Sequence, residues 1–312
     1  MSRIYDRGPP LGYEDFRLIR DLISDFCGIS FGDDACYLVE RRLRERLSAL
    51  SITDFTEYYR YLRYEVDARA ELERAVDILT TNETYFFRED YQLRAFEKEL
   101  LPSIHEQCSR ESNRRLALWS AGCSTGEEVY TLAMIVADSE LFEGWDVRIF
   151  GNDISRRVLN VARQARYGPG SFRAMPKRFD RWLIEEADGK RSVHPRIRSM
   201  CHFGHLNLMD VNRAAIVGQV HAIFCRNVLI YFDSDSRKKV IESFYERLVR
   251  GGCLLLGHSE SLLNFSTSFE LLHLSSDLVY RKPSHSRSDD PLHNGKNAQY
   301  KRVETTSGGR TK

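Results

Sequence analysis

The sequence has no apolar run that approaches the roughly 20 residues needed to cross a bilayer, so membrane insertion is not expected. Its first ten residues, MSRIYDRGPP, lack the apolar core of a secretory signal, which predicts a cytoplasmic location. Lys and Arg total 46 against 45 Asp and Glu, giving a net charge of +1. This near-neutral balance provides no overall field that would recruit nucleic acid.

The seven cysteines include no C-x-x-C pair, which is typical of reduced thiols rather than of a disulfide framework. A metal centre is not expected either, because Cys201, His202 and His205 have no second ligand pair at a spacing usable for zinc. A hydrophobic content of 42% supports a core, and 312 residues suffice for one large domain or two modest ones.

Lysine is absent before Lys98, and residues 13–80 show the apolar spacing of four short helices, which would form a bundle with its own core. The second helix, residues 37–50, carries four arginines between its apolar positions: Arg41, Arg42, Arg44 and Arg46. They could form a solvated face balanced by glutamates, or a docking surface for an acidic partner. The exclusive use of arginine, which suits bidentate contacts with carboxylates, favours docking.

The most informative stretch is Leu116 to Ala137, where an apolar strand, a glycine-containing loop and a helix follow one another. This order is typical of the ligand-binding corner of a doubly wound α/β sheet. No Gly-Lys-Ser/Thr follows the first glycine, so the loop is not a P-loop. Three interpretations stay open here: a nucleophile elbow, since residues 122–126 fit G-x-S-x-G with Ser124, a nucleotide-type site, or a turn that serves packing alone. Glu127 and Glu128 would repel pyrophosphate but suit a cationic ligand such as S-adenosylmethionine.

Two further stretches could contribute to a ligand site. In Thr80 to Arg88, the arginine could hold a carboxylate while Asn82 and Thr84 orient it, although the stretch could equally be a connector between domains. Asp153 follows a second apolar strand at 147–150, where nucleotide-binding folds grip a ribose diol. The alternative is that Asp153 only caps the following helix.

Residues 167–206 interrupt the alternation of strands and helices. Val193, Ile197 and residues 201–203 predict strands of a small antiparallel insert. The alternation returns with strands at 222–225 and 253–256 and a helix at 236–248, and a closing hairpin is expected within 271–281. Beyond Pro283 the sequence is polar and nearly free of apolar residues, which predicts a disordered tail.

Five of these stretches together resemble the chemotaxis receptor methyltransferases, the CheR family. They are TTNETYFFRE at 80–89, SAGCSTGEE at 120–128, GNDIS at 151–155, FCRNVLIYF at 224–232 and GGCLLLGHSESL at 251–262. The resemblance implies an α/β fold: a Rossmann-like class I methyltransferase domain with a small antiparallel β insert, preceded by an all-α N-terminal domain. We expect a helical receptor-docking domain at 1–85, the methyltransferase domain at 86–283 with its insert at about 168–206, and the tail at 284–312.

The resemblance also implies S-adenosyl-L-methionine as cofactor and S-adenosylhomocysteine as product. It assigns Asn82, Thr84 and Arg88 to the methionine end of the cofactor and the active site. Glu128 would bind the amine or contact the glycine loop, and Asp153 would hold the ribose. The remaining residues that it implies are Asn207, Leu208, Arg226 and Asn227 around the adenosine, and Tyr231 beside the transferred methyl group. The family often has proline where this sequence has Val129, a replaceable position in a first helical turn.

The implied activity is methyl transfer to glutamates on the cytoplasmic helical bundle of a chemoreceptor, giving methyl esters for sensory adaptation. A glutamate side chain is already ionised at pH 7 and needs no general base, so catalysis is mostly positioning by Arg88 or Tyr231. A monomer is expected. The 185–191 loop has the single glycine Gly189, which favours receptor binding without a C-terminal pentapeptide tether. The rivals are a hydrolase using Ser124 and His258, and a cofactor-binding sensor without turnover.

Overall fold

The computed structural model describes residues 9–263 and 265–284, so the tail predicted after Pro283 lies outside it apart from Ser284. The first domain is a helical bundle, and its helices are α1 (Tyr13–Cys27), α2 (Cys36–Leu50), α3 (Phe55–Tyr64) and α4 (Ala68–Leu79). Phe16 of α1, Leu43 of α2 and Tyr58 of α3 are fully buried in one core. The apolar spacing of residues 13–80 therefore predicted this bundle correctly.

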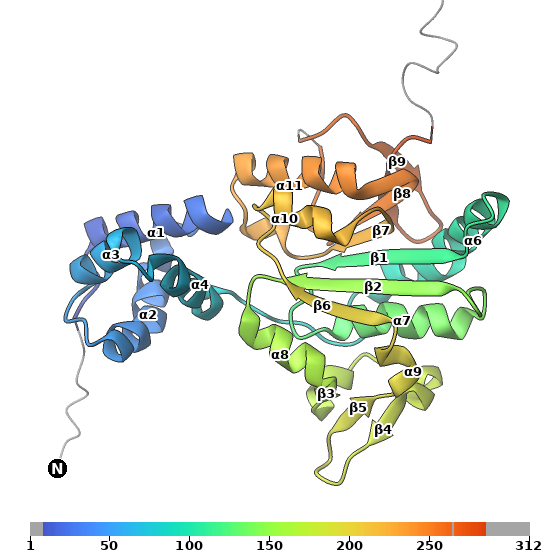
Figure 1. Cartoon of the computed structure of the whole chain (residues 1–312), viewed down its shortest axis with the longest axis horizontal. Helices are drawn as coiled ribbons and strands as arrows, with labels where there is room; N and C mark the ends of the chain where they lie inside the picture. The colour runs from blue at the N-terminus through green and yellow to red at the C-terminus, as the bar shows by residue number, and fades with distance from the viewer. Residues whose placement is uncertain (1–8, 264, 285–312) are drawn as a thin grey trace, which may run out of the picture.

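A seven-stranded sheet forms the second domain, in the order β6-β2-β1-β7-β8-β10-β9 (Figure 1). Its strands are β1 (Arg115–Ala121), β2 (Asp146–Asp153), β6 (Cys201–His205), β7 (Val220–Cys225), β8 (Leu248–Leu256), β9 (Glu270–His273) and β10 (Leu278–Arg281). The pairs among β6, β2, β1, β7 and β8 are parallel, whereas β10 runs antiparallel to β8 and β9. A parallel sheet needs helices on both faces.

The side chains of β1 alternate between the two faces of the sheet, and each face has its own core and its own helices. Leu116 and Leu118 belong to one apolar core, and Ala117 and Trp119 to the other, because successive side chains of a strand point to opposite faces. The first core also contains residues of α5 (Asp90–Ala95), a π-helical turn (Phe96–Leu100), α6 (Leu101–Arg110), α7 (Glu127–Ser139) and α8 (Arg156–Gln164). The second contains residues of α10 (Val211–Ala214) and α11 (Ser234–Arg247).

A separate three-stranded antiparallel sheet follows α8 and forms the insert. Its strands are β3 (Arg166–Tyr167), β4 (Leu183–Glu185) and β5 (Arg191–Val193), in the order β3-β5-β4. Two details of the sequence prediction are wrong. Ile197 lies in the short helix α9 (Pro195–Arg198), and residues 201–203 belong to β6, which pairs in parallel with β2 in the main sheet. A short apolar run predicts a strand but not its partner.

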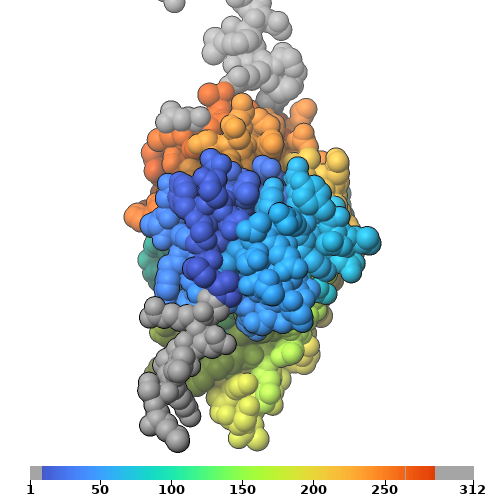
Figure 2. Space-filling view, turned by 90° about the vertical axis from the view of Figure 1, so that its left-hand side faces the viewer, coloured from blue at the N-terminus to red at the C-terminus, as the bar shows by residue number. Residues whose placement is uncertain are grey.

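The helical bundle lies against the side of the sheet where the parallel strands end (Figure 1). Viewed from that side, it covers the middle of the molecule, between the orange C-terminal part of the second domain above and the insert below (Figure 2). Backbone hydrogen bonds join the domains: Ser30 N donates to Tyr231 O over 2.8 Å, beside an antiparallel bridge between Ile29 and Phe232. Among the described helices, none combines the length and apolar character required to cross a membrane.

Candidate active site

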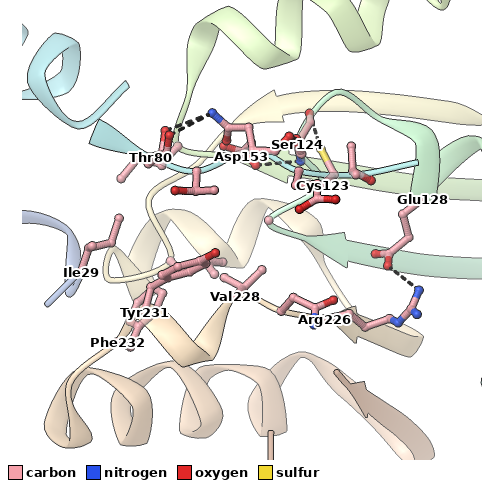
Figure 3. Close-up of a pocket in the computed structure, with 18 of the residues that line it drawn as sticks. Ile29, Thr80, Cys123, Ser124, Glu128, Asp153, Arg226, Val228, Tyr231 and Phe232 are labelled. Carbon is pink, nitrogen blue, oxygen red and sulfur yellow. Dashed lines mark hydrogen bonds and ion pairs between the residues drawn. The ribbon is translucent and has the colours of Figure 1, made fainter. Parts of the chain in front are cut away.

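One pocket lies between the ends of the parallel strands and the helical bundle. All ten residues that the resemblance implied line it, namely Asn82, Thr84, Arg88, Glu128, Asp153, Asn207, Leu208, Arg226, Asn227 and Tyr231. In Figure 3, Asp153, Ser124 and Cys123 lie along one side, and Tyr231 and Phe232 face them from the other. Side chains from across the whole sequence are therefore brought to one cavity, at the strand ends where α/β sheets bind ligands.

The loop after β1 is tightly folded around two glycines with positive φ, Gly122 at 78° and Gly126 at 92°. A Cβ on Gly126 would lie 2.8 Å from Ala162 Cβ, so no larger residue fits without displacing α8. The amides of Gly122 and Cys123 both donate to Asn152 O, at 2.8 and 2.9 Å, which fixes the loop across the end of β2. The loop backbone thus forms one wall of the pocket.

The nucleophile-elbow interpretation of this loop does not fit the geometry. Ser124 Oγ donates to Asn82 O over 3.1 Å, which holds the segment before α5 against the loop. The ring of His258, the proposed base, is exposed and contacts the ring of Tyr91, with 6.3 Å between centroids. Within the described part of the chain, no histidine hydrogen-bonds Ser124, so no Ser-His pair is formed.

Asp153 ends β2 with its carboxylate in the pocket wall. Its Oδ2 accepts from Ser124 N over 2.8 Å and its Oδ1 from Ser155 N over 2.9 Å. Burial raises the pKa of Asp153, although these two amides oppose the shift. The N-cap of α8 is Ser155, so the alternative that Asp153 merely caps that helix is wrong. Each carboxylate oxygen retains a second lone pair, so Asp153 can still accept from a ligand hydroxyl.

Arg226 is the centre of a buried ionic network at the end of β7. Its side chain is 3% exposed and contacts Glu128 and Glu89, each at 3.1 Å. The same guanidinium donates to Arg88 O over 2.6 Å, while Ser120 Oγ donates to Glu128 over 2.7 Å. Figure 3 shows the contact between Glu128 and Arg226. Because Arg226 and the Ser120 hydroxyl each contact one oxygen of its carboxylate, Glu128 is oriented before any ligand binds.

Arg88 is presented by a strained piece of backbone. The residues on either side, Phe87 and Glu89, have φ of 59° and 52°, which bulky residues rarely adopt. Burial of the Phe87 ring against Phe179 and the contacts of Glu89 with Arg226 hold this geometry. Arg88 itself is 28% exposed and donates to Glu83 O over 2.7 Å. Strain of this kind persists where the surroundings over-determine it, and it is concentrated at functional sites.

Tyr231 and Asn207 connect the pocket to the helical bundle. Tyr231 is 38% exposed and lies in a 3-10 turn (Leu229–Tyr231) whose last carbonyl accepts from Ser30 N over 2.8 Å. Asn207 Nδ2 donates to Phe26 O over 2.6 Å, and its Oδ1 accepts from Met209 N. The Asn207 side chain therefore secures the end of α1, in addition to lining the pocket.

The sequence prediction missed one part of the pocket completely. The helical bundle contributes an apolar wall, formed by Ile29, Phe31, Leu38 and Leu79. In the sequence these residues look like ordinary core positions of a bundle, and no local signal separates them from the rest. Only the packing of the bundle on the sheet brings them to the pocket.

The pocket fits an adenosyl cofactor with a charged amino-acid end. Two acidic side chains, Glu128 and Asp153, suit an amine and a ribose diol, and the apolar wall suits a purine. Within the described residues, the buried atoms Arg226 Nε and Asn227 Oδ1 have no partner in the protein, so a polar ligand could satisfy them. The fold and this site define a class I methyltransferase that uses S-adenosylmethionine.

Comparison with known proteins identifies the methyltransferase family to which the chain belongs. The family description "CheR methyltransferase, SAM binding domain" matches residues 82–277, and "CheR methyltransferase, all-alpha domain" matches residues 14–80. The chain therefore belongs to the CheR methyltransferase family, which confirms the resemblance, the fold class and the cofactor expected from the sequence.

Three curated relatives agree with this family assignment. Chemotaxis protein methyltransferase 2 of Vibrio cholerae is 35% identical, over 88% of this chain and 95% of its own length. Chemotaxis protein methyltransferase 1 of Pseudomonas aeruginosa is 33% identical, over 86% and 97%. The chemotaxis protein methyltransferase of Borreliella burgdorferi is 35% identical, over 79% and 87%. The match spans both domains, so the enzyme is a methyltransferase of the chemotaxis type.

Proposed function

We propose that this enzyme methylates glutamate side chains on the cytoplasmic helical bundle of a chemoreceptor, forming glutamate methyl esters for sensory adaptation. The observation that carries the proposal is that Arg88 and Tyr231 line the same pocket as Glu128 and Asp153. A cation and a phenol beside the cofactor residues are suited to receive a carboxylate.

The cofactor would be held by residues at both ends of the pocket. Asp153 would accept from the ribose hydroxyls, and Glu128, already aligned by Arg226, would accept from the amine. Asn82, Thr84, Asn207, Leu208 and Asn227 would complete the contacts. When bound, S-adenosylmethionine supplies the electrophilic methyl group.

The chain's own contribution to catalysis would be orientation. The incoming glutamate is ionised at pH 7 and attacks without a general base. Arg88 and Tyr231 would hold its carboxylate in line, with one oxygen directed at the reacting carbon. The Tyr231 hydroxyl has no hydrogen-bond partner among the described residues, so it is available to a substrate. Residues of the helical bundle line the pocket, and this cover would limit access of water.

Receptor docking would use fewer of the α2 arginines than the four that the sequence suggested. Arg46 pairs with Glu71, Arg42 donates to Leu79 O, and Arg44 pairs with Glu40. Arg41 is exposed and has no acidic partner in the described residues; it lies over the Tyr37 ring at 6.0 Å. Arg41 and the exposed Tyr37 are thus the part of α2 free to contact an acidic receptor helix.

The test is transfer of label from methyl-labelled S-adenosylmethionine to receptor-bearing membranes, scored as label released as methanol in mild alkali. Arg88→Ala should lower this transfer by about 100-fold or more, since a misplaced reacting group costs that much. Arg94→Ala is the matched control, because Arg94 is an exposed arginine of α5 whose single ion pair among the described residues is with Asp90. Full activity of Arg88→Ala would exclude its role. Binding of S-adenosylhomocysteine without any receptor labelling would favour a sensor instead.

A further inference from the structure

Glu260, a carboxylate outside the predicted site, binds the backbone of a loop that carries several predicted site residues. Glu260, in the Gly-His-Ser-Glu stretch after β8, accepts hydrogen bonds from four backbone amides. Its Oε2 accepts from Gly257 N at 2.6 Å and Asn227 N at 2.8 Å. Its Oε1 accepts from Val228 N at 3.0 Å and Ile230 N at 3.2 Å. A carboxylate with two oxygens and about four lone-pair sites is the side chain that can satisfy such a cluster.

The loop so bound runs from Arg226 to Tyr231, between β7 and the turn before α11. It presents Arg226 and Asn227 to the cofactor part of the pocket and Tyr231 to its mouth. Asn227 has φ of 58°, a left-handed conformation that asparagine adopts more readily than other non-glycine residues. Three of the four amides bound to Glu260 belong to this loop, so Glu260 holds the loop backbone from outside.

Gly257 leaves the space that the anchor requires. A Cβ at position 257 would lie 2.7 Å from Glu260 Oε2 and 2.8 Å from Asn227 N. Cβ atoms in proteins essentially never approach other atoms this closely, so a side chain at position 257 would push the Glu260 carboxylate away from the loop. The small size of Gly257 therefore allows Glu260 to bind the amides of Asn227, Val228 and Ile230.

We propose that Glu260 is a positioning residue for methyl transfer, which acts by holding the 226–231 loop so that Tyr231 faces the substrate carboxylate. The inference rests on the proposed function. Glu260 is not among the residues that line the pocket, so we expect it to act through the loop and not by touching cofactor or substrate. Its removal should disturb turnover more than cofactor binding, because Arg226 keeps its contacts with Glu128, Glu89 and Arg88 O.

The test compares Glu260→Gln with the matched control Glu270→Gln, an exposed glutamate of β9 paired with Arg281. Glutamine keeps the size of the side chain but turns an NH2 group toward amide donors that then lose their acceptor. We expect kcat for receptor labelling to fall about 10- to 100-fold. The dissociation constant of S-adenosylhomocysteine should change by less than about threefold, and Glu270→Gln should match the wild type in both.

A double-mutant cycle with Tyr231→Phe distinguishes positioning from general destabilisation. If Glu260 acts through Tyr231, Glu260→Gln should reduce kcat by less than about twofold in the Tyr231→Phe background. Gly257→Ala keeps the Glu260 charge but displaces the carboxylate from the loop amides. It should therefore also lower kcat while leaving the affinity for S-adenosylhomocysteine nearly unchanged. Should Glu260→Gln fail to fold, Gly257→Ala provides the same comparison.

The outcomes separate the two proposals. A wild type that binds S-adenosylhomocysteine but labels no receptor contradicts the proposed function. If the wild type labels the receptor and Glu260→Gln keeps its kcat within about twofold, or its effect simply multiplies with that of Tyr231→Phe, the inference about Glu260 is overturned.

Discussion

Replacing Arg46 with alanine should destabilise the helical bundle, although its place on a polar helix face made it a candidate for docking. Arg46 Nε and Nη2 donate to the two oxygens of Glu71, at 2.8 and 2.7 Å. Glu71 is fully buried, and its other partners are the Tyr58 hydroxyl at 2.9 Å and the largely exposed Arg74 at 3.4 Å. Without Arg46, a buried negative charge would lose its main counter-charge.

The expected cost follows from that burial. Removing one partner of a buried ion pair typically costs about 3–5 kcal/mol. The Tyr58 and Arg74 contacts remain, so we expect the lower end, about 3 kcal/mol. Against a total stability of about 5–15 kcal/mol for a domain, this loss is large. If the bundle unfolds as its own unit, Tm should fall by about 10–25 °C.

The assay is thermal unfolding by circular dichroism at pH 7.5, with receptor-labelling KM measured on the same variants. Arg41→Ala is the control on the same helix, since Arg41 is exposed and pairs with no acid among the described residues. It should leave Tm nearly unchanged and raise KM for the receptor. Arg46→Met combined with Glu71→Gln should recover much of the stability, because no buried charge is then left unpaired.

An Arg46→Ala variant with wild-type Tm and a raised receptor KM would refute this reasoning. It would mean that Arg46 docks a partner and that the contact with Glu71 contributes little. A double variant no more stable than Arg46→Ala would equally contradict the idea that the unpaired charge causes the loss.

Two further predictions concern the buried carboxylates Asp153 and Glu127. Asp153→Asn should weaken S-adenosylhomocysteine binding about 10- to 100-fold in calorimetry, since a hydrogen bond to a charged group contributes about 1.5–3 kcal/mol. The control is Asp146→Asn, because Asp146 is exposed. Unchanged affinity of Asp153→Asn would exclude the ribose role. Burial raises the pKa of Glu127, so its ionised form costs stability as pH rises above the ordinary carboxyl range. Glu127→Gln removes this penalty and can keep the contacts with the Thr125 and Ser171 hydroxyls. The Tm of the variant minus that of the wild type should therefore increase from pH 4.5 to 8. A difference in Tm that does not change with pH would contradict this.

Much of the active site was predictable because its chemistry is written in short stretches at strand ends. An apolar run followed by small residues and acids, as in Leu116 to Ala137, already indicates a strand, a tight loop and a helix. Parallel strands place their carboxyl ends together, so Glu128, Asp153 and Arg226 had to meet once the strands were recognised. The roles assigned to these residues stay predictions.

Other features depended on partners that lie far away in the chain. Arg46 looked like a surface cation until the fold brought Glu71 against it, 25 residues away. The sequence assigned no role to Glu260, because its partners in the 226–231 loop lie about 30 residues earlier in the chain. Residues 201–203 were recognisable as a strand, but their pairing with β2 was not.

The sequence by itself therefore predicted the helical bundle and the α/β sheet and, through its resemblance to the CheR family, the cofactor. Apolar periodicity and small-residue loops report local conformation and burial, and those properties depend on near neighbours in the chain. Only the tertiary structure decided which arginines are free, which strand joins which sheet, and which carboxylate anchors the Tyr231 loop. These are pairings between distant segments, and a hydrogen bond or ion pair depends on an approach within about 3 Å that no local pattern encodes.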